Sequence, residues 1–261
     1  MKKCDRSILS ILLAAILVIA GGVRSSAAAD GAPGVEERAD RILREMGEYL
    51  KTASEFTFKA DISYDSVETS GEKIEYGGVA KVAVHRPDRL HWEYVGDELQ
   101  RQSQAIINGS RFVLYKDAEN LYSRADVPSD LDGAIDHLVK KYGFPVPTAD
   151  LVYADPYSIL IENVESGFLV GLHPVDGTPC HHLAFSQEAI DWQIWIEDGP
   201  RPVPRKLVVT YKNEPSSPQY TARLSGWDFQ PRLSDRYFQF HPPAGASEIE
   251  FLPIQEREVK R

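Results

Sequence analysis

Residues 55–65 read Glu-Phe-Thr-Phe-Lys-Ala-Asp-Ile-Ser-Tyr-Asp, and this stretch decides the fold class. Its apolar side chains, from Phe56 to Tyr64, occupy every second position, and polar side chains fill the positions between them. Successive side chains of a strand point to opposite faces, so this period of two predicts a strand with one buried and one solvated face. The same alternation returns over residues 74–84 and 90–94. The sequence therefore predicts a series of neighbouring strands.

Further strand signals extend this pattern in both directions along the chain. Weaker ones cover residues 104–107, 111–115 and 120–124, and Asn108-Gly109 is a dipeptide typical of hairpin turns. A second set of predicted strands covers residues 168–173, 180–187, 190–197, 205–212, 220–229 and 236–240.

Helical spacing occurs in two regions, one before the first predicted strand and one between the two sets of predicted strands. In residues 35–53 the apolar positions, among them Leu43 and Met46, recur every three or four residues. Residues 129–142 repeat that spacing and end at Gly143, and short helical stretches follow at 149–153 and after Asp155-Pro156. We therefore expect a mainly β (α+β) fold: a curved antiparallel half-barrel of about ten or eleven strands with a helical lid or plug.

The N-terminus has the organisation of a secretory signal. A basic start with Lys2 and Lys3 precedes an apolar run over residues 8–20, and small residues follow, so we expect cleavage after Ala29. An uncleaved N-terminal anchor is the alternative, although the run is shorter than the ~20 residues of a membrane span. We expect an exported, periplasmic protein that is not an integral membrane protein. Its expected parts are residues 1–29 as signal, 30–254 as one domain and 255–261 as a frayed, charged tail.

Charge and composition exclude some classes of function. The chain of 261 residues has 29 Lys and Arg against 39 Asp and Glu, a formal net charge of −10. Residues 30–261 alone carry 25 cationic and 38 anionic side chains, which gives −13. A surface of this sign repels phosphate backbones, so we expect no nucleic-acid partner.

No motif in the sequence indicates catalysis, a cofactor or a metal centre. Cys180-His181-His182 resembles a ligand cluster, but on a strand only Cys180 and His182 share a face, and His173 joins them only across a hairpin. Cys180 is the one cysteine after Ala29, so we expect a buried thiol, with an intermolecular disulfide as the alternative. There is no Gly-x-Ser-x-Gly elbow and no glycine-rich phosphate loop. We expect no enzyme, no catalytic residue, no cofactor and no metal.

The apolar face of the predicted sheet is the candidate binding surface. It is rich in aromatic side chains, some of which we expect in an ordinary core and some in the wall of an apolar cavity. Burial of an acyl chain in such a cavity provides affinity without specific polar contacts. The candidate ligand-binding residues are Phe56, Phe58, Ile62, Tyr64, Tyr76, Trp92, Tyr94, Phe112, Leu114, Leu138 and Leu151.

Three stretches resemble the LolA-like periplasmic proteins, which include the outer-membrane lipoprotein carriers. The stretch over residues 82–93 is similar to that family's strand, Arg-Pro turn and aromatic strand. Residues 107–115 resemble its hairpin, and residues 237–246 resemble its Phe-x-Phe-x-Pro-Pro-x-Gly ending. The segments 131–157 and 195–207 also resemble an uncharacterised predicted periplasmic family of the same superfamily.

This resemblance implies a half-barrel whose helical lid covers an apolar cavity for acyl chains. It assigns Arg86, the arginine of the Arg-Pro turn, to lid contact and cargo transfer; the alternative is a structural role in capping lid carbonyls. The implied function is a periplasmic carrier or binding protein for lipids or lipoprotein acyl chains. Two other functions stay open: an envelope sensor or interaction module with a lipidated or protein partner, and a hydrolase with a polar cluster in the cavity.

Overall fold

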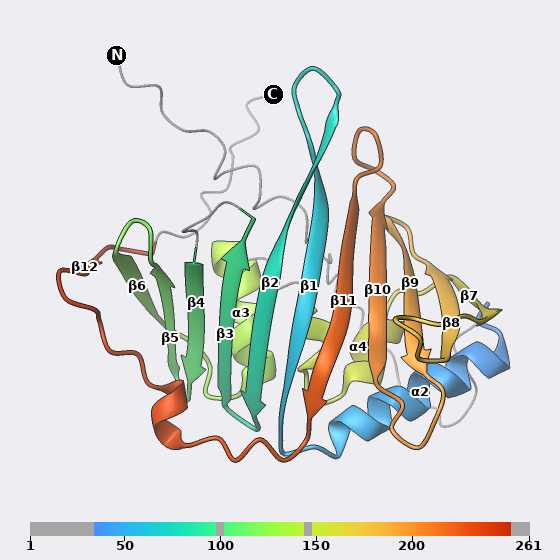
Figure 1. The fold of residues 1–261 in the computed structure, drawn as a ribbon, viewed down its shortest axis with the longest axis horizontal. Helices are drawn as coiled ribbons and strands as arrows, with labels where there is room; N and C mark the ends of the chain where they lie inside the picture. Colours follow the sequence, from blue (N-terminus) through green and yellow to red (C-terminus); the bar gives the residue numbers. More distant parts are fainter. Residues whose placement is uncertain (1–33, 98–101, 144–147, 252–261) are drawn as a thin grey trace.

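All strands of the protein belong to one curved sheet, as the computed structural model shows for residues 34–97, 102–143 and 148–251 (Figure 1). The sheet has twelve strands among these residues, in the order β12-β6-β5-β4-β3-β2-β1-β11-β10-β9-β8-β7. Neighbouring strands are antiparallel except for β12 and β6. The strands are β1 (Glu55–Val67), β2 (Lys73–His85), β3 (Arg89–Gly96), β4 (Gln102–Asn108), β5 (Arg111–Lys116), β6 (Leu121–Asp126), β7 (Ser166–Leu172), β8 (Cys180–Ser186), β9 (Ile190–Glu197), β10 (Pro204–Tyr211), β11 (Gln219–Asp228) and β12 (Ser247–Glu248).

Two successive meanders build this sheet. Strands β1–β6 form one and β7–β11 the other, and the pairing of β1 with β11 joins them in the centre. Tyr64 lies opposite Tyr220 in this central pair, and Ile62 lies opposite Ala222. The alternation that predicts β1 therefore continues across the centre, because both partners in each pair point to the same face.

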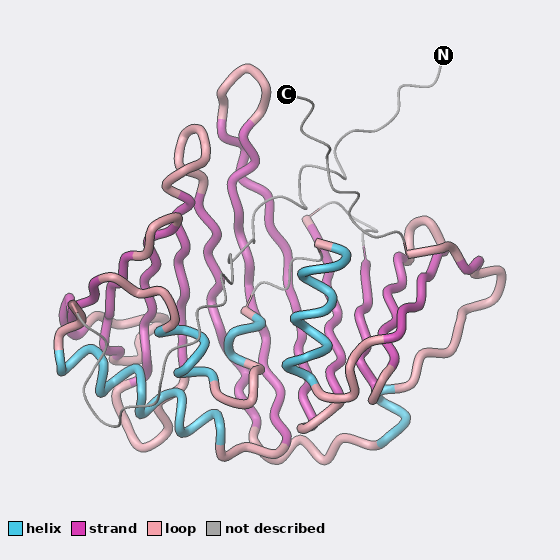
Figure 2. Tube along the Cα trace, turned by 180° about the vertical axis from the view of Figure 1, so that it is seen from behind, coloured by secondary structure: helices cyan, strands magenta, loops and turns pink. Residues whose placement is uncertain are grey.

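The helices cover one face of the sheet, which we call the inner face (Figure 2). They are α2 (Glu37–Lys51), α3 (Leu131–Tyr142), the 3₁₀ helix η2 (Ala149–Leu151) and α4 (Pro156–Ile161). Asp130 accepts a hydrogen bond from the backbone N–H of Gly133 at the start of α3, and Gly143 ends that helix in the left-handed conformation. We call these helices and the connections between η2 and α4 the lid.

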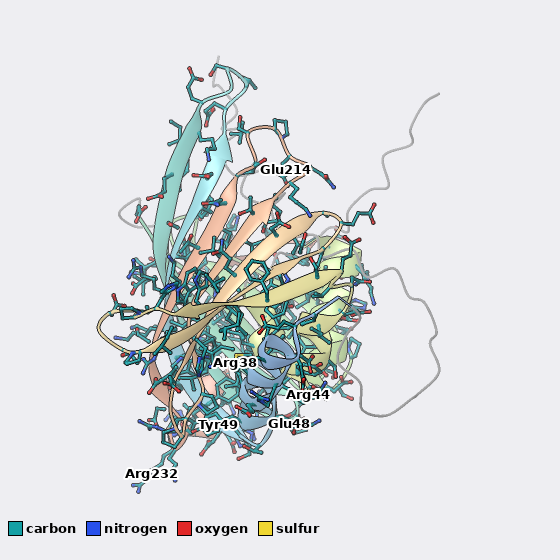
Figure 3. All side chains as sticks on the ribbon, turned by 90° about the vertical axis from the view of Figure 1, so that its right-hand side faces the viewer. Arg38, Arg44, Glu48, Tyr49, Glu214 and Arg232 are labelled. Carbon is teal, nitrogen blue, oxygen red and sulfur yellow. The ribbon has the colours of Figure 1, made fainter. Side chains whose placement is uncertain are left out.

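One hydrophobic core lies between lid and sheet. Leu43 and Met46 of α2, Leu138 of α3 and Leu151 of η2 are buried in the same cluster as the inner-face side chains of the strands. Seen from the side, α2 lies against the sheet with Arg44 and Glu48 on its outer surface (Figure 3). A mainly β half-barrel with a helical lid is thus confirmed.

Some predicted elements differ from the observed ones. The strand predicted over 236–240 is wrong: Asp235–Phe238 is the 3₁₀ helix η3, and the two-residue strand β12 follows it. The helical stretch predicted over 149–153 is shorter, since η2 ends at Leu151. The predicted signal over 1–29, its cleavage after Ala29 and the tail over 255–261 lie outside the described residues.

Candidate functional site

The nine candidate binding residues on strands all lie on the inner face. Register places Trp92 beside Val82, which pairs with Phe58, and Tyr94 beside Ala80, which pairs with Ala60. Leu138 and Leu151 belong to the lid elements that face the sheet. The remaining pairs follow the same register: Phe56 with Val84, Tyr64 with Tyr76, Ala105 with Leu114 and Ile107 with Phe112.

These eleven residues fall into two groups by burial. The packed group is buried in the core and consists of Phe56, Phe58, Ile62, Phe112, Leu138 and Leu151. The half-buried group keeps accessible surface and consists of Tyr64, Tyr76, Trp92, Tyr94 and Leu114. A fully packed side chain contacts a ligand only if the core rearranges. The half-buried group is therefore the part of the inner face that offers apolar surface to a ligand.

Two ring pairs organise the half-buried group. Trp92 and Tyr94 are two positions apart on β3, and their rings are stacked with centroids 5.4 Å apart and planes 3° apart. Tyr64 and Tyr76 pair across β1 and β2 with centroids 6.0 Å apart. The Tyr94 hydroxyl donates a hydrogen bond of 3.0 Å to the carbonyl of Gly77, which fixes the end of this ring. The half-buried group thus consists of two stacked aromatic pairs and the aliphatic side chain of Leu114.

Arg86 joins the sheet to the lid. One guanidinium nitrogen donates hydrogen bonds of 2.7 Å to the carbonyls of Leu50 and Ala53, at the end of α2. The other donates to the carbonyls of Val152 and Tyr153, at 3.3 and 2.7 Å, just after η2. Burial lowers the pKa of Arg86 and the nearby Asp132 opposes this effect. Arg86 thus caps lid carbonyls, while any role in cargo transfer stays a prediction.

Further side-chain bonds connect the parts of the lid to one another. Asp132 of α3 accepts a hydrogen bond of 2.9 Å from the N–H of Ala154, and Asp136 accepts one of 2.9 Å from the hydroxyl of Tyr153. Between α2 and α4, Asp40 accepts a hydrogen bond from the hydroxyl of Tyr157. These contacts hold the lid as a connected unit over the inner face.

Three polar residues of the inner side escape prediction from the sequence: Asp150 of η2, Tyr211 of β10 and Tyr220 of β11. Tyr211 lies opposite Ile190 and Tyr220 opposite Tyr64, which places both rings on the inner face. The Tyr220 hydroxyl is buried and has no hydrogen-bond partner among the described residues. Burial raises the pKa of Asp150 to about 6. The sequence indicates Asp150 only by the position of this acidic residue between the apolar Ala149 and Leu151.

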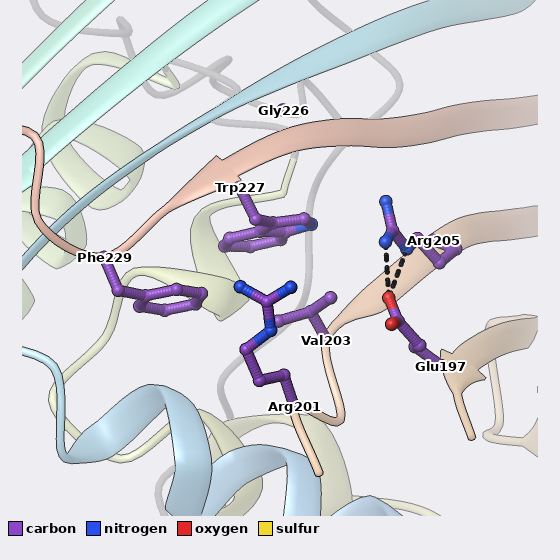
Figure 4. A pocket seen from close by; sticks show the side chains of 7 residues that line it. All are labelled: Glu197, Arg201, Val203, Arg205, Gly226, Trp227 and Phe229. Carbon is purple, nitrogen blue, oxygen red and sulfur yellow. Dashed lines mark hydrogen bonds and ion pairs between the residues drawn. The ribbon is translucent and has the colours of Figure 1, made fainter. Parts of the chain in front are cut away.

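A separate pocket of about 240 Å³ lies where β11 ends (Figure 4). Trp227 and Phe229 form its aromatic wall, and the guanidinium of Arg201 points toward both rings. Trp227 stacks on Phe58 with centroids 4.5 Å apart, so its indole separates this pocket from the core. Glu197, Val203, Gly226 and Arg205, which forms an ion pair with Glu197, complete the lining.

Cys180 and His182 lie on the other face of the sheet. Cys180 is a buried free thiol that donates to the carbonyl of Thr178. His182 stacks on Trp195 with centroids 3.9 Å apart, and its Nδ1 lies 3.0 Å from the Nδ1 of His173. Within the described residues, no three His, Cys, Asp or Glu side chains are grouped so that they could hold a metal ion.

Comparison with known proteins identifies a family and several structures of similar fold. The family model described as "Predicted periplasmic protein (DUF2092)" matches residues 39–252. No curated protein matches the sequence. In the parts of the chain that the structure describes, no helix has the length and apolar character needed to cross a membrane.

Three solved structures illustrate the similarity of fold. An uncharacterised conserved protein from Thermus thermophilus is 12% identical, with a TM-score of 0.49, and the match covers 82% of this chain and 99% of that one. The lipoprotein LppX of Mycobacterium tuberculosis is 13% identical (TM-score 0.47; 76% and 98% covered). A LolA superfamily protein from Nitrosomonas europaea is 10% identical (TM-score 0.40; 77% and 97% covered).

Proposed function

We propose that this chain, which belongs to the family of predicted periplasmic proteins (DUF2092), binds lipids or lipoprotein acyl chains beneath its lid and acts as a periplasmic carrier without catalysis. One observation supports this function above the others. The half-buried group, with the stacked Trp92 and Tyr94 at its centre, leaves apolar surface accessible on the face that the lid covers. Each CH₂ group of an acyl chain buried there contributes about 0.8 kcal/mol.

Uptake of a fluorescent fatty acid, together with native mass spectrometry of protein purified from its own periplasm, tests this proposal. We expect bound acyl species in the purified protein and saturable uptake after delipidation. Trp92→Ala should weaken uptake about tenfold or more, because it removes the larger ring of the stacked pair. Trp195→Ala is the matched control, since Trp195 lies on the opposite face against His182. Absence of bound acyl species and of uptake would contradict the proposal.

A protein partner is the second candidate, and the edge strand β7 favours it. Phe168, Val170 and Leu172 are 55%, 41% and 55% exposed on this strand. Residues 34–36 cover the first half of this edge, where Val35 forms a parallel bridge with Gly167 and the Glu36 carboxylate accepts a hydrogen bond from the N–H of Leu169. An exposed apolar edge strand is a template for pairing with another chain. If a Val170→Lys variant still takes up lipid but no longer supports the function of the protein in the cell envelope, an interaction or sensing function is favoured.

A further inference from the structure

We propose that His173 and His182 bind a divalent copper ion on the face of the sheet opposite to the inner face, which we call the outer face. His182 lies on β8 and His173 follows the end of β7, so the connection between these paired strands brings the two residues together. The site is separate from the half-buried group, and the inference goes beyond the proposed lipid-binding function. It starts from the short distance between two imidazole rings.

The two rings are placed like neighbouring ligands of one ion. Their Nδ1 atoms are 3.0 Å apart, and the ring planes are tilted by 56°. Nitrogen ligands bind a transition metal at about 2.0–2.1 Å, so two of them at a right angle are about 2.9 Å apart, and two at a tetrahedral angle about 3.3 Å. The observed separation is thus close to that of a tetragonal site. Nitrogen and oxygen ligands in this arrangement are typical of Cu²⁺ and Ni²⁺.

His182 already has the tautomer and the fixed orientation that a metal ligand needs. Its Nε2 lies 2.9 Å from Oε1 of Gln193, and an amide oxygen only accepts, so the imidazole proton is on Nε2. Its Nδ1 therefore presents a lone pair toward His173. The ring also stacks on Trp195 with planes 12° apart. In proteins, metal-binding histidines are commonly oriented by such a carbonyl partner on the second ring nitrogen.

The local backbone makes room for the second ring. A bulge between Leu169 and Gly171 shifts the register of β7, so that Gly171 lies opposite His182. Gly171 has no side chain, and the ring of His173 lies beside it: a Cβ at Gly171 would be 3.6 Å from Nε2 of His173. His182 is only 8% exposed, whereas His173 is exposed. An ion between the two Nδ1 atoms therefore has a buried ligand and an exposed one, and solvent can reach it.

The proton between the two nitrogens has to move when the ion binds. Because Nδ1 of His182 accepts the hydrogen bond, Nδ1 of His173 donates it. Exchange with water transfers this proton to Nε2 of His173, which leaves both Nδ1 atoms with lone pairs and the net number of protons unchanged. Water supplies the other ligands, since within the described residues no third His, Cys, Asp or Glu side chain joins the pair. Cys180 donates its thiol hydrogen to the carbonyl of Thr178 instead.

A pair of imidazoles favours Cu²⁺ over the other common divalent ions. Affinity for nitrogen ligands rises from Ni²⁺ to Cu²⁺ and falls again at Zn²⁺. Structural zinc sites usually have four protein ligands and catalytic ones three, in tetrahedral geometry, so two ligands near a right angle fit Zn²⁺ poorly. The net charge of −10 attracts cations to the protein in general.

Calorimetric titration with CuSO₄ at pH 7.5 tests the inference, with glycine present to keep unbound Cu²⁺ in solution and with protein that carries no histidine tag. The variants are His173→Ala and His241→Ala, which is the matched control because it removes another exposed histidine. We expect the wild type and His241→Ala to bind one equivalent of Cu²⁺. His173→Ala should bind it at least about tenfold more weakly, because it loses one of two protein ligands. Electron paramagnetic resonance of the one-to-one complex should report two imidazole nitrogens in the wild type.

Two results would overturn the inference. One is a wild type that binds no Cu²⁺ in competition with glycine, and the other is His173→Ala that binds Cu²⁺ as tightly as the wild type, which would place the ion elsewhere. Gln193→Leu is an independent check, since it keeps both ligands but removes the partner that fixes the tautomer of His182, and we expect about tenfold weaker binding. The lipid-binding proposal is tested separately, by uptake of a fatty acid at the opposite face.

Discussion

At the scale of single residues, Arg86 shows how one side chain closes the structure over the inner face. It donates to four carbonyls that belong to two separate parts of the lid. The Leu50 carbonyl also accepts a bond of 3.2 Å from the N–H of Ala53, while the other three, which follow α2 and η2, have no backbone donor among the described residues. Arg86 therefore couples the two parts of the lid through one group on the sheet.

We expect Arg86→Ala to lower the free energy of unfolding by about 2–4 kcal/mol, because it leaves several partly buried carbonyls without a donor. Urea denaturation measures this change, and hydrogen exchange at residues 50–53 and 152–154 should accelerate. Arg223→Ala is the control, since the Arg223–Asp176 pair is exposed and contributes little. An unchanged stability together with unchanged exchange would show that Arg86 does not hold the lid.

Asp150 leads to a prediction about pH. Folding raises its pKa from 3.8 to about 6, so the folded chain binds the proton more tightly than the unfolded chain does. The group therefore costs stability above about pH 6, and this cost disappears as the pH falls through 6 toward 4. Tyr153 and Tyr211, the titratable groups that interact with it, stay neutral throughout this range.

We accordingly expect Asp150→Asn to stabilise the ligand-free protein by about 1–2 kcal/mol at pH 7.5, a value reduced for the remaining exposure of the residue. Near pH 4 the wild type and the variant should differ much less. Urea denaturation at both pH values measures the difference. Asp61→Asn is the control, because Asp61 is exposed on the outer face of β1 and its substitution removes the same charge. A difference of the same size at both pH values would mean that the charge of Asp150 is not responsible.

The sequence predicts the apolar part of the candidate site better than its polar part. Alternation alone places Trp92 and Tyr94 on the face that the helices cover. It does not separate the packed Phe58 from the half-buried Trp92, because burial depends on which part of the sheet the lid covers. Tyr220 comes to lie opposite Tyr64 only through the pairing of β1 with β11, which has no local signal in the sequence.

At the scale of elements, close contact between α2 and α4 depends on a glycine. A Cβ atom at Gly47 would lie 2.5 Å from the Cβ and 2.9 Å from the N of Tyr157. We expect Gly47→Ala to lower the free energy of unfolding by about 1–3 kcal/mol, although alanine favours helix. Glu45→Ala, at an exposed position of the same helix, is the control in the same denaturation measurement. A Gly47→Ala variant that is as stable as the wild type would indicate that α2 shifts freely on α4.

Comparison of the predicted and observed strands shows where an alternating sequence pattern is sufficient to predict a strand. Long alternating segments such as β1 and β9 are predicted almost to the residue, because many positions agree on the period. In residues 236–240, Phe238 and Phe240 are two positions apart as in a strand, but so short a stretch does not distinguish a strand from a 3₁₀ turn. There Phe238 is buried by packing against the sheet, and backbone pairing contributes nothing.

At the scale of the whole molecule, the two faces of the sheet are covered by different parts of the chain. The lid covers the inner face (Figure 2), and residues 230–248, which we call the strap, run from the end of β11 to β6 (Figure 1). The strap contacts β3 and β4 through η3, where Asn108 donates to the carbonyl of Phe238 at 3.2 Å. Lid and strap therefore stabilise the same sheet from different sides.

This division predicts that damage to the strap lowers stability without changing the binding surface. Phe238 is 1% exposed, and its ring packs edge-on against His85 and near the guanidinium of Arg89, whose Cζ is 5.5 Å from the ring centroid. Phe238→Ala should lower the free energy of unfolding by about 3–4 kcal/mol because it empties a buried site. Tyr237→Ala, at a residue that is 38% exposed, should cost less.

The same Phe238→Ala protein should bind a fluorescent fatty acid with wild-type affinity at a temperature where it is fully folded. His85 and Arg89 occupy strand positions that alternate with Val84 and Leu90, so the strap contacts the face opposite to the half-buried group. Trp92→Ala should show the reverse behaviour, with weaker binding and a smaller loss of stability, because Trp92 is only half-buried. If Phe238→Ala weakens binding as much as Trp92→Ala does, the ligand surface extends beyond the inner face and the lid does not define it.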